Sequence, residues 1–108
     1  MENKIYAFLG LAARAGRLAA GHEACERIIK KGKACLVITA EDGSQNTVKR
    51  FEGICRIKGV NIRRFGLKDY IGRYIGKTPR SVIVITDKEF AGKLLDMIDN
   101  AKKEAGGE

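Results

Sequence analysis

Two short runs of apolar and β-branched residues constrain the fold of this chain more than any other feature. CLVIT occupies residues 35–39 and VIVIT occupies residues 82–86. Neither run shows the apolar–polar alternation of a strand with one wet face, and both are too short for a typical helix. Glycine, proline or turn-forming residues flank each run. The two runs therefore predict strands of a sheet that helices cover on both faces.

Five helix-like segments alternate with these two runs and with two weaker strand candidates, 18–20 and 61–65. The first four predicted helices end at Gly16, Gly32, Gly59 and Gly76. Their apolar positions are Ile5, Phe8, Leu9 and Ala12; Cys25, Ile28 and Ile29; Val48, Phe51, Ile54 and Cys55; and Leu67, Ile71, Tyr74 and Ile75. Ser44 or Asn46 can cap the third helix, and Thr86 with Glu89 predicts a capping box for the fifth.

The alternation of helices and strands is typical of the α/β class, with a largely parallel central sheet and helices on both faces. The short strand at 18–20 is expected at an edge or in antiparallel pairing, which makes the sheet mixed. No repeat and no linker divides the chain. We expect a single domain over residues 1–101 and a flexible polar tail, KKEAGGE, over residues 102–108.

Positive charge is concentrated in the middle of the chain. The net charge is +8, and residues 14–80 hold 16 basic and 6 acidic residues, whereas residues 81–108 hold 4 basic and 6 acidic residues. A cationic excess confined to part of a small domain indicates a polyanionic partner. Charge alone does not distinguish RNA, DNA and acidic lipid.

The residue groups that catalysis and metal binding require are missing from the sequence. His22 is the only histidine, and the three cysteines are few and widely spaced, unlike a disulfide framework or a zinc site. No phosphate-binding loop motif occurs, and no apolar run approaches the roughly 20 residues that span a bilayer. We therefore expect no enzyme, no metal, no cofactor and no membrane contact, and a location in the reducing cytoplasm. A nucleophilic Cys25 near a helix start is an alternative, but it shares a face with Ile28 and Ile29.

The stretch GRLAAGHEACERIIKKGKA, residues 16–34, predicts an anion-binding helix start. Gly21 precedes a helix whose first backbone N–H groups and positive dipole end face outward. Arg27 lies one turn into that helix and Lys31 lies one turn beyond Arg27, so we expect these two cations to form one stripe on the helix. A second cationic loop, GKTPR, covers residues 76–80. Separately, Tyr70 and Tyr74 lie four residues apart on a helix. They either form a stacking surface for bases or place Tyr74 in the core with its hydroxyl at the rim.

Three segments resemble a known family: FLGLAARAGRLAAG, AEDGSQNT and IGRYIGKTPRSVIVITDKEFA. They are similar to the bacterial YlxQ-type proteins, small relatives of the ribosomal protein L7Ae family, whose archaeal and eukaryotic members bind kink-turn RNA. The resemblance covers residues 4–98. It implies a three-layer α/β/α sandwich with a central four-stranded mixed sheet and about five helices. It also implies RNA binding, association with the ribosome or its assembly, and no enzyme activity.

The resemblance also places the contact residues, and it implies that the loop holding Lys77 and Arg80 lies beside the helix opened by Gly21. Kink-turn binders open their second helix with Gly-Thr-Asn-Glu-x-x-Lys, and the matching positions here are Gly21, His22, Glu23, Ala24 and Arg27. Because a carboxylate at 23 only accepts hydrogen bonds and is repelled by phosphates, we expect weak kink-turn selectivity. The expected RNA-binding residues are Arg17, Gly21, His22, Glu23, Arg27, Lys30, Lys31, Lys77, Thr78 and Arg80.

We thus expect a monomeric, non-catalytic protein whose partner is structured RNA, rRNA in particular, with ribosomal proteins as further partners. Two other hypotheses remain open on the residues alone. The chain is a protein-interaction module, or it is a stand-alone relative of the substrate domain of an rRNA methyltransferase.

Overall fold

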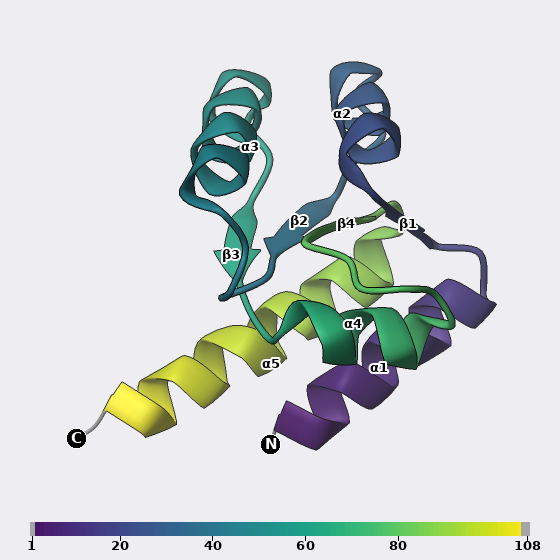
Figure 1. The fold of residues 1–108 in the computed structure, drawn as a ribbon, viewed down its shortest axis with the longest axis vertical. Helices are drawn as coiled ribbons and strands as arrows, with labels where there is room; N and C mark the ends of the chain where they lie inside the picture. Colours follow the sequence, from purple (N-terminus) through teal and green to yellow (C-terminus); the bar gives the residue numbers. More distant parts are fainter. Residues whose placement is uncertain (1, 107–108) are drawn as a thin grey trace.

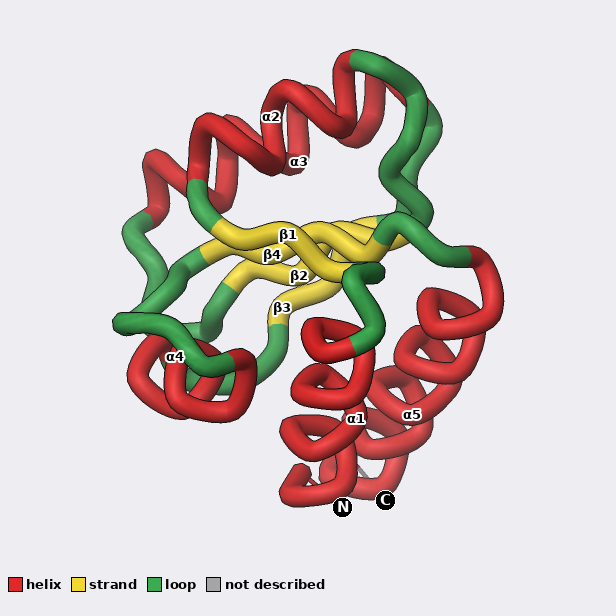
Figure 2. Tube along the Cα trace, turned by 90° about the vertical axis from the view of Figure 1, so that its right-hand side faces the viewer, coloured by secondary structure: helices red, strands yellow, loops and turns green. Residues whose placement is uncertain are grey.

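The computed structural model describes residues 2–106, which form five helices and four strands in strict alternation. In chain order these are α1 (Glu2–Arg14), β1 (Leu18–Ala20), α2 (His22–Lys30), β2 (Leu36–Thr39), α3 (Gln45–Lys58), β3 (Ile62–Arg64), α4 (Lys68–Ile75), β4 (Val82–Ile85) and α5 (Lys88–Gly106) (Figure 1). Helices α2 and α3 cover one face of the sheet, and α1, α4 and α5 lie on the other side (Figure 2). The expected α/β class and three-layer sandwich are confirmed.

The sheet has the order β1-β4-β2-β3. Only β2 and β3 are parallel, because β4 runs antiparallel to both β1 and β2. The placement of β1 at an edge, antiparallel to its neighbour, is confirmed, but the expectation of a largely parallel sheet was wrong. The reason is that the connection from β3 through α4 to β4 begins and ends at the same end of the sheet. Its two ends are joined there by a hydrogen bond from the Arg80 N–H to the Lys68 carbonyl at 3.2 Å. The chain therefore re-enters the sheet at the end where β3 left it.

Strands β2 and β4 are buried at every position, as their unbroken apolar sequences predicted. Alternate side chains of these strands pack into two separate hydrophobic clusters, one on each face of the sheet. Leu36 and Ile38 join a cluster with side chains of α1, α4 and α5, whereas Val37 joins a smaller cluster with Phe51 and Cys55 of α3. A strand with helices on both faces needs apolar side chains at consecutive positions, and this arrangement explains the composition of both runs.

Helix α3 begins and ends where the local sequence indicated, whereas α5 does not begin as expected. The Ser44 hydroxyl accepts from the Thr47 N–H at 3.2 Å and caps α3, and Gly59 ends that helix with φ of 70°. The expected cap of α5 at Thr86 was wrong. The Asp87 carboxylate accepts from the Phe90 N–H at 2.9 Å, because the helix begins one residue later than the capping-box pattern implied.

Helix α5 is longer than its sequence pattern predicted. It continues to Gly106, so residues 102–106, which were expected to form a polar tail, are helical. The segment Ala101–Ala105 consists of alanine, lysine and glutamate, which are strong helix formers, and no glycine or proline interrupts it. Residues 107–108 of the expected tail lie outside the described residues.

Candidate nucleic-acid interface

Four connections meet at one end of the sheet. Ala20, at the end of β1, pairs with Ile83 of β4. Thr39, at the end of β2, pairs with Val82 of β4 and with Arg64 of β3. The starts of α2, α3 and α4 and the loop before β4 therefore share this end. Three helix N-termini gather there, an arrangement that favours anions. Ser44 caps α3 and the Asp42 carboxylate accepts from the Lys68 N–H of α4, whereas no side-chain hydrogen bond caps α2.

The start of α2 lies beside the loop of residues 76–81, as expected from the sequence. The Gly21 N–H donates to the Val82 carbonyl at 3.0 Å, and a shallow depression of about 430 Å³ separates the two segments. It is lined by Ala20, Gly21, His22, Glu23, Ala24, Pro79, Arg80 and Ser81. Gly21 has φ of 102° and ψ of 156°, a conformation that is almost restricted to glycine. The glycine therefore sets the direction in which α2 leaves the sheet.

The 76–81 loop is seated on α4 by close backbone contact. A Cβ atom at the buried Gly72 would lie 2.3 Å from the Thr78 carbonyl oxygen, and the Lys77 N–H donates to the Gly72 carbonyl at 2.8 Å. The loop in turn holds Arg80, whose Nη1 donates to the carbonyls of Thr78 at 3.0 Å and Pro79 at 3.2 Å and also contacts the Thr78 hydroxyl. These contacts fix the arginine while most of its five-donor fork can still reach a ligand.

His22 links the starts of α2 and α3. Its Nε2 lies 3.0 Å from the Thr47 Oγ1, and the Ser44 hydroxyl donates to that same oxygen at 3.0 Å. The imidazole ring also packs 5.9 Å from the ring of Phe51. Thr47 was missed in the sequence analysis, because 25 residues separate it from His22 and no local pattern connects them.

The outer face of α2 carries cations and carboxylates together. Glu23, Arg27 and Lys31 follow one another at intervals of four and line a shallow groove, which confirms the expected stripe. In the same groove Glu26 binds Lys30 at 2.9 Å and Arg50 of α3 at 2.7 Å. Hydrogen bonds from Lys30 and Arg50 hold the pKa of the Glu26 carboxyl below its ordinary value. The charge of Lys30 is therefore partly offset within the protein.

The structure separates some of the expected contact residues. Gly21, His22, Glu23, Thr78 and Arg80 come together at the start of α2, and Lys77 belongs to the same loop. Lys31 lies ten residues from Gly21, roughly 15 Å away at the rise of an α-helix. Arg17 precedes β1 and so lies at the opposite end of that strand. Two of the expected contact residues, Arg17 and Lys31, thus lie away from the start of α2.

Groups suited to covalent or metal chemistry are buried or scattered. The Cys25 thiol lies 3.7 Å from the carbonyl oxygens of Ala19 and Val82, and burial raises its pKa to about 12. It is a protonated core residue rather than a nucleophile at neutral pH. Among residues 2–106 no three His, Cys, Asp or Glu side chains are grouped to hold a metal ion. No helix within this range has the length and apolarity needed to cross a bilayer.

Comparison with known proteins agrees with this arrangement. Residues 3–95 match the model of the ribosomal protein L7Ae/L30e/S12e/Gadd45 family. The chain is 35% identical over 94 residues to the RNA-binding protein YlxQ of Bacillus subtilis, covering 87% of this chain and 94% of that protein. It is also 35% identical over 98 residues to the RNA-binding protein YlxQ of Enterococcus faecium, covering 91% of this chain and 94% of the relative.

Two solved structures share the fold. A protein of unknown function from Bacillus halodurans superposes with a TM-score of 0.86 at 35% identity, covering 89% of this chain and 97% of the other. The Giardia lamblia 15.5kD RNA binding protein superposes with a TM-score of 0.76 at 22% identity, covering 88% of this chain and 84% of the other. The matched model, the two sequence relatives and the shared architecture lead to one conclusion: this chain belongs to the ribosomal protein L7Ae/L30e/S12e/Gadd45 family.

Proposed function

We propose that the protein is a non-catalytic RNA-binding protein that holds structured RNA at the start of α2 and on the 76–81 loop. The observation that carries the proposal is the pairing of the glycine-opened helix start with Arg80, which the loop fixes beside it. A helix N-terminus and a guanidinium fork both suit phosphate oxygens. The names of the two YlxQ relatives and of the Giardia neighbour support the same partner class.

At this surface the charge distribution supports contact with the sugar–phosphate backbone of RNA rather than with its bases. The net charge is +8, and the cations of α2, α3 and the 76–81 loop all belong to the basic middle of the chain. Phosphate contacts supply affinity and register, whereas base edges supply sequence selectivity. We therefore place this protein among RNA binders that recognise backbone shape, with rRNA as the partner and the ribosome or its assembly as the setting. In this proposal it acts as a monomer in the cytoplasm.

Selectivity for kink-turns is expected to be weak. The exposed Glu23 and the half-buried Ala24 stand where kink-turn binders carry asparagine and glutamate. Because one good base contact contributes about 1–3 kcal/mol, a standard kink-turn should bind no more than about tenfold better than a matched duplex. The double change Glu23→Asn, Ala24→Glu should raise that preference. Tight and selective kink-turn binding by the unaltered protein would show that these two positions do not control selectivity.

The dependence of affinity on salt tests the proposal as a whole. With roughly four to six phosphates engaged, the logarithm of the association constant should fall with the logarithm of salt concentration at a slope of about −3 to −5. The measurement is a filter-binding or anisotropy titration with a fluorescent stem-loop RNA at several salt concentrations. A slope near zero would contradict phosphate contact and favour a protein-interaction module instead.

A further inference from the structure

Helix α4 presents two tyrosines and an arginine to solvent. Arg73 and Tyr74 lie three and four residues after Tyr70, so all three share one side of the helix. Tyr70 is 43% exposed and Tyr74 is 40% exposed. The interpretation of Tyr74 as a core residue was therefore wrong. The expected apolar position Leu67 is also 42% exposed, because it precedes the helix as its cap.

A groove of about 770 Å³ runs between this side of α4 and the start of α1. The ring of the buried Tyr6 forms its floor and holds the two exposed rings in place. Tyr6 stacks on Tyr74 with centroids 5.1 Å apart at 19°, and it meets Tyr70 edge-on at 5.8 Å. Its hydroxyl accepts from the Leu67 N–H at 2.9 Å. Three aromatic rings are thus fixed in a preformed surface groove.

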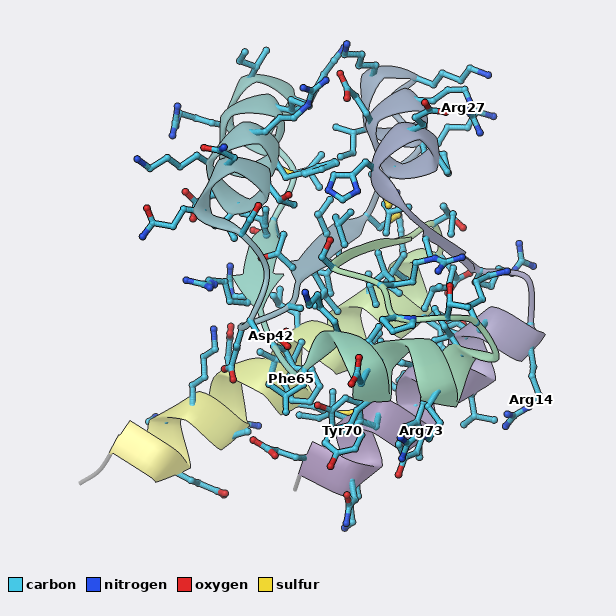
Figure 3. The ribbon with its side chains drawn as sticks, viewed as in Figure 1. Arg14, Arg27, Asp42, Phe65, Tyr70 and Arg73 are labelled. Atoms are coloured by element: carbon cyan, nitrogen blue, oxygen red, sulfur yellow. The ribbon has the colours of Figure 1, made fainter. Side chains whose placement is uncertain are left out.

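One cation, Arg73, lies beside these rings. The Arg73 guanidinium carbon is 5.3 Å from the centroid of the Tyr70 ring, and Figure 3 shows the two side chains close together on α4, on the far side of the molecule from Arg27. Lys77 lies beyond the end of α4, in the 76–81 loop, and is not among the residues that line the groove. A ring with a cation beside it matches an RNA strand, in which each base has a phosphate beside it.

We propose that this groove binds an unpaired nucleobase of RNA, which stacks on the exposed tyrosines while Arg73 contacts a flanking phosphate. Stacking on aromatic side chains is the usual way in which proteins hold unpaired bases. Helix α4 leads directly into the 76–81 loop, so one RNA can reach both surfaces. The tyrosine groove is a separate surface from the start of α2, and its occupation does not depend on phosphate binding there.

The carboxylates in the groove narrow the choice of base. Glu2 and Glu41 both line it. A carboxylate repels phosphate but accepts hydrogen bonds from the exocyclic amino groups of cytosine, adenine and guanine. Uracil has no exocyclic amino group. The groove therefore favours these three bases over uracil.

A cationic peptide segment is the competing occupant, because tyrosines and carboxylates also attract ammonium and guanidinium groups. Arg73 argues against it. This arginine already lies over the Tyr70 ring and would repel a second cation at that face. The observations favour a nucleobase, and the peptide becomes an outcome of the test.

Intrinsic fluorescence makes the test direct. The chain has three tyrosines and no tryptophan, and all three tyrosines line this groove. The full-length protein is titrated with short single-stranded oligocytidylate, oligoadenylate and oligouridylate. We expect saturable quenching by the first two. Their affinities should exceed that of oligouridylate at least about fivefold, because one hydrogen bond to an amino group contributes about 1 kcal/mol or more.

Matched variants locate the binding. Tyr70→Ala should weaken oligocytidylate binding at least about fivefold, the effect of losing one stacked base, whereas Tyr70→Phe should retain it. Arg73→Ala should weaken binding as well, and Arg56→Ala, an exposed arginine of α3, should not. Melting temperatures are measured for each variant. If Tyr70→Ala destabilises the protein, Arg73→Ala provides the same test from an exposed side chain without a core contact.

Two outcomes would overturn the inference. One is unchanged oligonucleotide affinity in Tyr70→Ala and Arg73→Ala proteins that melt like the wild type. The other is quenching by an oligolysine peptide and not by oligonucleotides, which would assign the groove to a protein partner. Arg27→Ala separates this inference from the proposed function, because it should weaken stem-loop binding and leave oligocytidylate binding unchanged.

Discussion

The two ends of α2 carry a glycine and nearby cations, but their surroundings differ. At the start, Gly21 is bonded to β4, and His22 contacts Thr47 of α3. At the other end, the backbone N–H groups of Lys31 and Lys33 donate to carbonyls of α2 itself. The start is thus assembled from segments distant in the sequence, whereas the far end is local. We infer that the assembled end is a site and that the other end supplies only charge.

The most damaging change to the assembled end lies outside α2. In Gly72→Ala, the new methyl group would lie 2.3 Å from the Thr78 carbonyl and displace the loop that holds Arg80. We expect a loss of about 1–3 kcal/mol in the free energy of unfolding, as for other overpacked sites. Affinity for stem-loop RNA should also fall more than for any single-cation variant. Chemical denaturation and anisotropy measure the two effects.

Gly53→Ala is the matched control for that change. Gly53 also lies within a helix, but a Cβ atom there meets nothing within 4 Å. Replacement of a helical glycine by alanine should raise stability by roughly 0.5–1 kcal/mol and leave RNA binding unchanged. If Gly72→Ala behaves like Gly53→Ala in both measurements, the close contact between α4 and the 76–81 loop is not needed to position Arg80 for RNA binding.

The glycines at the two ends of α2 permit a direct comparison. A Cβ atom meets nothing within 4 Å at either Gly21 or Gly32, so alanine costs stability only through backbone conformation. Gly21 has φ of 102° and Gly32 has φ of 76°. We expect the free energy of unfolding to fall by about 1–3 kcal/mol in Gly21→Ala and by about 1–2 kcal/mol in Gly32→Ala. Only Gly21→Ala should weaken RNA binding beyond its effect on folding, measured at a temperature where both variants are folded. Equal losses of affinity would remove the distinction between the two ends.

The features that sequence reasoning recovered are those encoded within a few residues. The glycine-opened helix, the α2 stripe and the doubly buried strands follow from local periodicity, and the resemblance placed the 76–81 loop beside Gly21. The direction of β4 was not recoverable, because it depends on where the chain returns after α4. The roles of Gly72 and Thr47 were missed for the same reason, since each acts through a partner that only the folded chain brings near. Glu26 was missed because cations were counted without their neighbours.

Single cations should have smaller effects than the glycines that place them. Arg80→Ala removes a guanidinium at the assembled end, and Arg27→Ala removes one from the stripe of α2. We expect each to weaken stem-loop binding by about 1 kcal/mol or more, the strength of a lost charge-assisted contact. The loss should be greater for Arg80, because the loop holds its side chain in place. Melting temperatures should barely change.

The double variant Lys102→Ala, Lys103→Ala provides the control for net charge. Both lysines are exposed on α5, away from the start of α2, and the double change removes two charges rather than one. It should reduce affinity far less than either single arginine variant. If it loses as much affinity as Arg27→Ala, binding is a diffuse effect of charge and neither end of α2 is a site.

The smallest expected effect concerns Glu26, whose carboxylate offsets positive charge near the C-terminal end of α2. Glu26 binds Lys30 and Arg50, so Glu26→Gln should release both cations toward phosphate. We expect the slope of log affinity against log salt to steepen by about 1, with little change in melting temperature. Because hydrogen bonds lower the pKa of this carboxyl in the folded protein, its ion pairs persist at neutral pH and are lost as the pH falls through that lowered pKa. The wild type and Glu26→Gln should therefore differ at neutral pH and converge in acid. If their slopes agree at neutral pH, RNA does not reach the far end of α2, and the assembled end alone accounts for binding.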